Sequence, residues 1–305
     1  MIPEKIKKGD TIGVIAPSDF IEEGDLEYIN ASIALMEASG FNVKFGNYVF
    51  KNDLKYGTDP KNRAKDINMM FEDRDVKAIM CVKGGEDSNS CLDYIDYKLI
   101  KNNPKIICGF SDNTSILDVI NDKTELVTYH GPTFKSLTSW ETGYAYEQFI
   151  KNLTYNGSEE KSTIIGNTED EYITIKPGET RGKLIGGNLS LFAKLVCGKH
   201  KVNINNKILF LEELGYEASP KSVNSNIYYL KQNGVFENIA GLWIGNYEHF
   251  SKITLEEIIT NAIGDECKIP IIKSNNFGHI DKKTIIPIGQ EAEINTNEKV
   301  KITLK

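Results

Sequence analysis

Four residues of this sequence could together perform nucleophilic catalysis. Ser111 follows the apolar run "KIICGF", the adjacent Glu212 and Glu213 follow "KILFL", and His279 comes shortly after "KIPII". A serine hydroxyl becomes a good nucleophile when an imidazole takes its proton, and a carboxylate that orients the imidazole stabilises the charge that forms on it. These residue types predict a serine hydrolase and leave the choice between the two glutamates open.

Such a reaction also needs N–H groups that bind the oxyanion of the tetrahedral intermediate. Gly84 and Gly85 follow the apolar run "VKAIMCV", and glycines let the backbone turn sharply and present bare N–H groups. The N–H of Asp112 lies directly behind Ser111 at the start of a predicted helix. We expect Gly85 and Asp112 to supply the two oxyanion donors.

Each candidate also has an ordinary structural explanation. A serine at the start of a helix is usually an N-cap. The glutamates could be solvated loop carboxylates, and His279 could be a turn residue. His130 in "TYHGPT" is the rival base, although Gly131 and Pro132 beside it suggest a rigid turn in which the ring packs or bonds to the backbone. Only the combination of residues favours catalysis.

The first half of the chain alternates strand and helix patterns. The runs "TIGVIAP", "FNVKFG", "VKAIMCV" and "KIICG" read as strands, and the helical spacing between them is framed by Asp59 and Pro60 at one start and by Gly40 after one end. This alternation predicts an α/β fold with an open parallel sheet. Sites in such sheets form outside the carboxyl ends of the strands, where Gly85 and Ser111 are expected.

The second half predicts another α/β domain. The runs "KILFLEE", "AGLWIGN" and "KIPIIKS" alternate with two helices, one starting at Ser219 and Pro220, the other with the capping-box pair Thr254 and Glu257. Glu212 and His279 follow strands of this one unit, so they can lie on the same edge of its sheet. The end "TIIPIGQEAEINTNEKVKITL" is typical of an antiparallel hairpin.

Polar, irregular sequence separates the two halves. We expect an N-terminal domain at residues 1–156 with the nucleophile, a linker with an antiparallel ribbon at 157–182, and a C-terminal domain at 183–305 with the glutamate and histidine. A length of 305 residues also favours two domains, because single hydrophobic cores stop growing at about 250–300 residues.

Composition excludes several classes of function. The net charge is −7 and only three residues are arginine, which argues against a surface for a nucleic-acid polymer. The first residues lack the apolar run of a signal peptide or membrane span, so a cytoplasmic protein with no membrane partner is expected. The five cysteines show no zinc-ligand spacing and are expected to be buried, reduced thiols.

Several blocks resemble the LD-carboxypeptidase family of serine peptidases. They are "GGEDSNSCLDYIDY", "NPKIICGFSDNTSIL", "YHGPTF", "GKLIGGNLSLF", "ILFLEELG", "GLWIGNYEHF" and "NNFGHIDKKTIIPIGQEAEI", and together they span nearly the whole chain in order. The likeness is closest to the branch that contains the microcin C self-immunity peptidase. The resemblance implies a Rossmann-like N-terminal domain, a smaller C-terminal domain with barrel character, a homodimer and no metal or organic cofactor.

The resemblance also implies roles for single residues. The family's Ser-Glu-His triad carries over onto Ser111, Glu212 and His279, which selects the first of the two glutamates, and its oxyanion donors fall on the backbone of Gly85 and Asp112. LD-carboxypeptidases remove the terminal D-alanine from a murein tetrapeptide, whereas the immunity branch cleaves the bond between a peptide's last residue and a nucleotide-like group.

Two features bear on the choice of substrate. Murein-trimming members tend to carry an aromatic residue after the glycine pair, where this chain has Glu86 and Asp87, which favours a peptidyl-nucleotide substrate. The immunity peptidase stacks a tryptophan of its interdomain loop on the base, a contact worth about 1–3 kcal/mol, and residues 157–182 contain none. Tyr172 is the aromatic that could replace it, although it also fits a strand.

Two alternatives lie outside this family. An α/β-hydrolase esterase shares the order Ser, acid, His, but its nucleophile motif needs a small residue where this chain has Asn113. A non-catalytic protein whose two lobes close on a small ligand would use Ser111 only as a hydrogen-bond donor. Covalent labelling of Ser111 separates a hydrolase from such a binding protein, because a binding protein has no activated hydroxyl.

Overall fold

The computed structural model describes residues 1–139, 142–155, 157, 165 and 171–305. The chain divides into two compact units, residues 1–160 and 161–305. The division lies inside the predicted linker 157–182, of which residues 158–164 and 166–170 fall outside the described part of the chain.

The first unit contains the predicted parallel sheet. Its strands lie in the order β5-β4-β3-β1-β2, and each pairs in parallel with its neighbour in this order. Their bounds are β1 Thr11–Ile15, β2 Asn42–Phe45, β3 Val76–Cys81, β4 Ile106–Gly109 and β5 Thr128–His130. Strand β4 is buried along its whole length, as expected for a parallel strand covered on both faces. The prediction of an open α/β sheet is confirmed.

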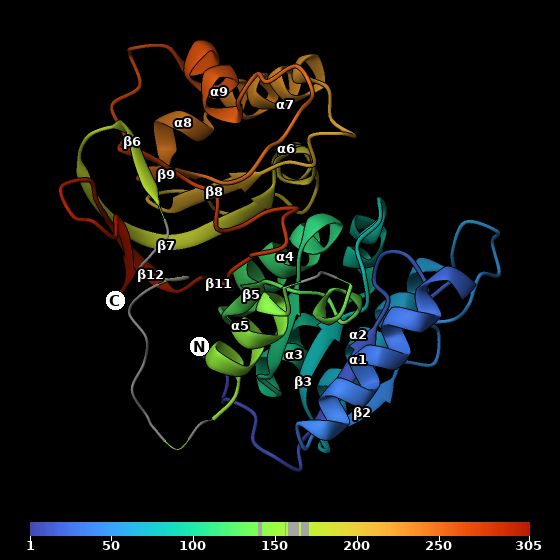
Figure 1. The fold of residues 1–305 in the computed structure, drawn as a ribbon. Helices are drawn as coiled ribbons and strands as arrows, with labels where there is room; N and C mark the ends of the chain where they lie inside the picture. The colour runs from blue at the N-terminus through green and yellow to red at the C-terminus, as the bar shows by residue number, and fades with distance from the viewer. Residues whose placement is uncertain (140–141, 156, 158–164, 166–170) are drawn as a thin grey trace. The chain divides into compact units, whose positions relative to one another are not determined.

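Helices pack around this sheet (Figure 1). The α-helices are α1 Leu26–Ala38, α2 Pro60–Glu72, α3 Tyr97–Asn102, α4 Thr114–Thr124 and α5 Tyr144–Leu153, and the 3-10 turns are η1 Glu23–Asp25, η2 Ser88–Tyr94, η3 Ser111–Asn113 and η4 Lys135–Leu137. Helix α2 starts as predicted, because the Asp59 side chain accepts a hydrogen bond from the Lys61 N–H and Pro60 occupies the first turn. Helix α2 contacts β1 and β3, and α4 contacts β4 and β5.

The second unit contains a curled, mixed sheet (Figure 1) in the order β13-β12-β7-β8-β9-β10-β6. Strands β7, β8, β9 and β10 pair in parallel, while β12 pairs antiparallel with β7 and β13, and β6 antiparallel with β10. The strands of this sheet are β6 Tyr172–Lys176, β7 Glu179–Asn188, β8 Ile208–Glu212, β9 Gly241–Ile244, β10 Ile271–Ser274, β12 Glu291–Asn295 and β13 Ile302–Leu304. A short strand outside it, β11 Ile286–Ile288, lies between β10 and β12 in the sequence. The predicted C-terminal hairpin is β12 and β13.

The helices of this unit are α6 Leu189–Cys197, α7 Pro220–Gln232, α8 Val235–Asn238 and α9 Leu255–Ile263. Two of the predicted starts are present: Ser219 caps α7, and Thr254 and Glu257 form a capping box at α9. Part of the predicted ribbon at 157–182 lies outside the described residues, and the ribbon stays a prediction. Of the described strands near it, β6 pairs with β10, while β7 pairs with β8 and β12.

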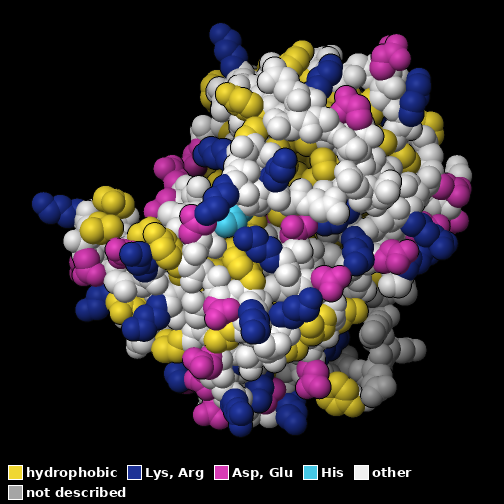
Figure 2. Space-filling view, turned by 180° about the vertical axis from the view of Figure 1, so that it is seen from behind, with side chains coloured by type: hydrophobic (Ala, Val, Ile, Leu, Met, Phe, Trp, Pro, Cys, Tyr) yellow, Lys and Arg dark blue, Asp and Glu magenta, His cyan; other side chains and the backbone are white. Residues whose placement is uncertain are grey.

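The surface carries both signs of charge. On the face drawn in Figure 2, Lys and Arg side chains are interspersed with Asp and Glu side chains. Within the described part of the chain, no helix combines the length and the apolar character that crossing a membrane requires.

Candidate active site

Ser111 lies at the corner between β4 and the turn η3. Its backbone is left-handed, with a φ of 63°, which is rare for a residue other than glycine and costs conformational energy. The cap positions of η3 and α4 are held by Phe110 and Asn113, so Ser111 is not the cap residue of either. The corner therefore keeps this half-buried serine in a strained conformation of the kind that clusters at functional sites.

The glycine turn after β3 lies against this serine. A Cβ added to Gly84 would lie 3.0 Å from Ser111 Cβ and 3.1 Å from its Oγ, tighter than ordinary contacts. Gly85 has a φ of 155°, and a Cβ there would overlap Asp19 Oδ1. The backbone of Gly85 is one that side chains rarely adopt, so this position favours glycine. The structure brings Gly84 and Ser111 together as the sequence predicts.

The carboxyl group of Asp112 ties this corner to two other loops. Its Oδ2 accepts hydrogen bonds from Ser18 Oγ at 2.5 Å and from the Ser88 N–H at 2.7 Å, while Ser88 Oγ donates to the Asp112 carbonyl at 2.7 Å. Burial raises the pKa of Asp112 above its ordinary value, although the hydrogen bonds from Ser18 and Ser88 act in the opposite direction. The sequence predicts a role only for the backbone N–H of this residue, and its side chain adds a structural one.

In the second unit, Glu212 and His279 form a direct pair. Glu212 is the last residue of β8 and is fully buried, and its Oε2 lies 2.7 Å from His279 Nδ1. An ionised carboxylate only accepts hydrogen bonds, so Nδ1 carries the proton in this pair. Gly278 has a φ of 118°, and a Cβ there would lie 3.1 Å from Glu212 Oε2. The glycine lets the chain cross closely over the glutamate.

Burial alone would lower the pKa of His279, but the charge of Glu212 and their hydrogen bond outweigh it, so this pKa is raised above its ordinary value. Lys283, from the same loop, is 2% exposed. Burial lowers the pKa of Lys283 to about 7, although the charges of Glu212 and Asp281 act to raise it. This buried lysine beside the pair was missed, because the run "DKK" reads as a solvated turn.

Glu213, the second candidate acid, is occupied elsewhere. It accepts hydrogen bonds from Asn188 Nδ2 at 2.8 Å, from the Ser190 N–H at 3.0 Å and from Ser190 Oγ. Asn188 also caps α6 and lies 3.4 Å from Glu212 Oε1 through its Nδ2. Asn188 was not predicted as a site residue, and its only sequence signal is its position at a strand-to-helix junction.

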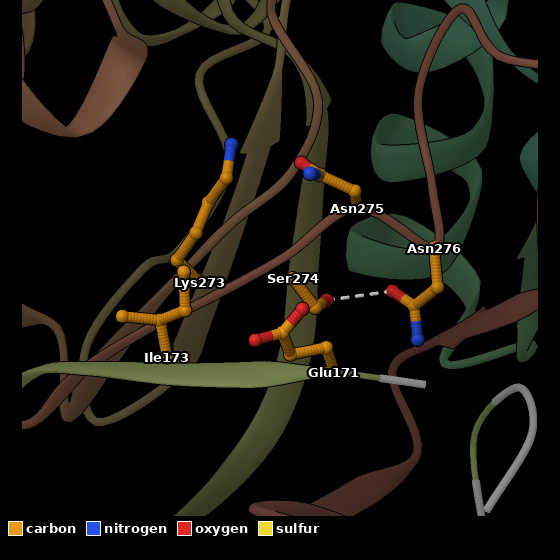
Figure 3. Close-up of a pocket in the computed structure, with 6 residues that line it drawn as sticks. All are labelled: Glu171, Ile173, Lys273, Ser274, Asn275 and Asn276. Atoms are coloured by element: carbon orange, nitrogen blue, oxygen red, sulfur yellow. Dashed lines mark hydrogen bonds between the residues drawn. The ribbon is translucent and has the colours of Figure 1, made fainter. Parts of the chain in front are cut away.

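The loop that carries His279 is anchored next to a small polar pocket (Figure 3). The pocket has a volume of about 140 Å³ and is lined by Glu171, Ile173, Lys273, Ser274, Asn275 and Asn276. Ser274 Oγ accepts from Trp243 Nε1 at 2.8 Å and donates to Asn276 Oδ1 at 2.7 Å. Asn276 Nδ2 donates to Tyr172 Oη at 3.3 Å. These bonds hold the chain three residues before His279, and Tyr172, proposed as a stacking aromatic, belongs to this anchor on β6.

The remaining candidates lie in ordinary surroundings. His130 is buried at the end of β5, with its ring centroid 6.3 Å from that of Phe110. Cys81, Cys91 and Cys108 are buried as predicted, and burial raises the pKa of the Cys91 thiol to about 12, while Cys197 is exposed. In the part of the chain that the structure covers, no three His, Cys, Asp or Glu side chains are grouped so that they could hold a metal ion.

Comparisons with known proteins extend over both units. One family model, the LD-carboxypeptidase N-terminal domain, matches residues 12–131, and a second, the LD-carboxypeptidase C-terminal domain, matches residues 181–294.

Two curated relatives cover nearly the full chain. The sequence is 30% identical over 313 residues to a Bacillus subtilis protein named "Probable murein peptide carboxypeptidase", with 98% of this chain and 93% of the relative covered. It is 29% identical over 324 residues to the microcin C7 self-immunity protein MccF of Escherichia coli, with 97% and 93% covered.

Solved structures are similar over the same length. An MccF-like protein from Bacillus anthracis has a TM-score of 0.89 and 32% identity, and covers 100% of this chain and 99% of its own. MccF in complex with glutamyl sulfamoyl guanosine has a TM-score of 0.87 and 26% identity, with 99% of this chain and 98% of its own covered.

Proposed function

Because the chain belongs to the LD-carboxypeptidase family of serine hydrolases, we propose that it cleaves an amide or related acyl bond at the end of a small peptide-like substrate. Ser111 is the nucleophile, His279 the general base and Glu212 the residue that orients the imidazole. The backbone N–H groups of Gly85 and Asp112 bind the oxyanion.

The observation that carries this proposal is the 2.7 Å contact between Glu212 Oε2 and His279 Nδ1. With Nδ1 fixed as the protonated nitrogen, Nε2 is the atom that takes the proton of Ser111. Ser111 Oγ then attacks the scissile carbonyl carbon, the leaving group takes the proton back from Nε2, and a water molecule hydrolyses the acyl-enzyme by the same route. The strained backbone of Ser111 supports its role.

For the substrate we propose a peptidyl or aminoacyl nucleotide. Two features support this choice: MccF binds glutamyl sulfamoyl guanosine, and the glycine pair of this chain is followed by Glu86 and Asp87 instead of an aromatic residue. The alternative is a murein tetrapeptide, which the likeness to the Bacillus subtilis protein favours. The homodimer, the cytoplasmic location and the domain bounds 1–156 and 183–305 stay predictions.

A paired hydrolysis assay tests the proposal. The chain is incubated with a peptidyl-aminoacyl adenylate mimic and, separately, with a murein L,D-tetrapeptide, and the products are read by mass spectrometry. We expect release of the nucleotide part from the first compound. Cleavage of the tetrapeptide alone would assign the chain to murein recycling.

Ser111→Ala should lower turnover by roughly three to six orders of magnitude, because it removes the nucleophile and leaves only binding and oxyanion stabilisation. Circular dichroism and the unfolding midpoint should be close to those of the wild type. Near-normal turnover in this variant would show that Ser111 is not the nucleophile.

A further inference from the structure

The segment at residues 83–87, which contains the glycine turn, is held by an ion pair at each end. Lys83 Nζ lies 2.7 Å from Asp25 Oδ2. Arg63 Nη1 and Nη2 donate to the two carboxylate oxygens of Asp87 at 2.7 and 2.8 Å. The Arg63 contact is bidentate, and such a pair fixes orientation as well as distance.

Arg63 joins Asp87 to a second loop. It projects from α2 and is 4% exposed, and its Nη1 also donates to the carbonyl oxygens of Pro17 at 3.1 Å and Ser18 at 3.3 Å. Its Nη2 donates to Ser90 Oγ at 2.9 Å. One planar guanidinium therefore connects the loop after β1 with the loop after β3.

Those two loops also hold the turn that follows Ser111. Ser18, whose carbonyl accepts from Arg63, donates its hydroxyl to Asp112 Oδ2, and Ser88, next to Asp87, donates its N–H to the same oxygen. A continuous set of hydrogen bonds thus runs from Arg63 through both loops to Asp112. It includes Asp112, whose N–H is one proposed oxyanion donor, and Asp87, which lies two residues after the other donor, Gly85.

We propose that Arg63 is a positioning residue of this hydrolase. Acting through Asp87 and Ser18, its guanidinium fixes the turn with Gly85 and the turn with Asp112 relative to each other. The inference rests on the proposed function, because it takes these two N–H groups as the oxyanion site. A displacement of about 1 Å in such a site can cost about a hundredfold in rate.

The first test is the kinetics of Arg63→Lys, with kcat expressed per active site titrated by a fluorophosphonate. A lysine ammonium cannot make the forked contact with Asp87 and reach the Pro17 and Ser18 carbonyls together. We expect kcat to fall roughly ten- to a hundredfold while KM changes less than about threefold, because oxyanion contacts are stronger in the transition state than in the bound substrate.

Asp87→Asn provides a second variant that leaves the buried arginine in place, since the Asp87 side chain is 44% exposed. It should lose kcat in the same way, and the double variant should lose little more than either single one, because both substitutions break one connection. Free guanidinium ion should restore part of the kcat of Arg63→Ala. Arg181→Met, which removes a 64% exposed arginine paired with Glu293, should keep the wild-type kcat.

Wild-type kcat in both Arg63→Lys and Asp87→Asn would overturn the inference. The inference would also be overturned if the variants had fewer active sites that react with the fluorophosphonate but an unchanged kcat per site. That pattern would mean that Arg63 only helps the chain to fold. If the wild-type chain itself shows no Ser111-dependent turnover of either substrate, the proposed function fails and the inference fails with it. An active wild type with unaffected variants overturns the inference alone.

Discussion

Two adjacent glutamates follow one another at the end of β8, and their neighbours give them different environments. Glu212 lies against the His279 ring, with 2.7 Å between Oε2 and Nδ1. Glu213 accepts hydrogen bonds from Asn188 and Ser190 at the start of α6. A carboxylate satisfied by a helix N-terminus is poorly placed to orient an imidazole, and this difference supports our choice of Glu212.

Glu212→Gln should move the acid limb of the kcat/KM profile to lower pH. Acylation needs a neutral imidazole, so the wild type loses activity as pH falls through the pKa of His279. Burial lowers this pKa, and the charge and hydrogen bond of Glu212 raise it further than burial lowers it. Glutamine removes the charge, so the pKa drops, while the plateau should fall by roughly 10²–10⁴ through loss of the oriented tautomer. The profile is measured from about pH 5 to 9.

Glu213→Gln is the matched control for this profile. Its acid limb should move to lower pH by less than that of Glu212→Gln, because the charge of Glu213 also raises the pKa of His279 but is the smallest of the causes that act on it. Its free energy of unfolding should fall because the start of α6 loses a charged acceptor. An acid limb that moves further in Glu213→Gln than in Glu212→Gln would assign the orienting role to Glu213.

The nucleophile, acid and base candidates could be named from the sequence because parallel sheets gather functional groups at the carboxyl ends of their strands. The surrounding residues could not. Arg63 contacts Asp87 across 24 positions, and nothing in the local pattern of α2 marks it as different from a surface arginine. Lys283 stands among charged residues and is nevertheless buried. Both depend on tertiary packing, which a local pattern does not encode.

Among the elements, β7 passes unusually close to its neighbour. Gly186 has a φ of 129°, and a Cβ there would overlap the carbonyl oxygen of Phe210 in β8. Strand β8 carries Glu212, and the two strands pair in parallel up to Asn188 and Glu212. The glycine therefore sets the approach of the strand that supports the candidate acid.

Gly186→Ala should lower the free energy of unfolding by roughly 3 kcal/mol or more, because the methyl group meets backbone that cannot move aside and the φ is one that alanine rarely adopts. Urea denaturation followed by circular dichroism measures the change. Gly198→Ala is the control: its nearest contact would be 3.4 Å, so its midpoint should stay close to the wild-type value. Equal midpoints for the two variants would contradict the argument.

Sequence patterns identified elements best where local chemistry defines them. The starts of α7 and α9 were predicted from Ser219 and from the Thr254 and Glu257 pair, since capping involves neighbours within one turn. The partners of the strands could not be predicted in this way. Strand β6 pairs with β10, and β7 pairs with β8 and β12, and pairing at such sequence distance leaves no local mark.

At the scale of the whole molecule, the proposed site draws on both compact units. Ser111 belongs to residues 1–160, while Glu212 and His279 belong to residues 161–305. The rival base, His130, lies in the same unit as Ser111, with its ring beside Phe110. If His130 is the base, nucleophile and base come from the first unit alone. If His279 is the base, the reaction requires residues of both units.

His279→Ala should abolish labelling of Ser111 by a fluorophosphonate, with the rate falling roughly 10³-fold or more, because the hydroxyl loses the group that takes its proton. His130→Ala should keep labelling but unfold more easily, since it removes a side chain that is 2% exposed. Intact-mass spectrometry follows the adduct, and thermal unfolding confirms that each variant is folded. The reverse pattern would place the base beside the nucleophile in the first unit and leave the Glu212 and His279 pair without the role proposed for it.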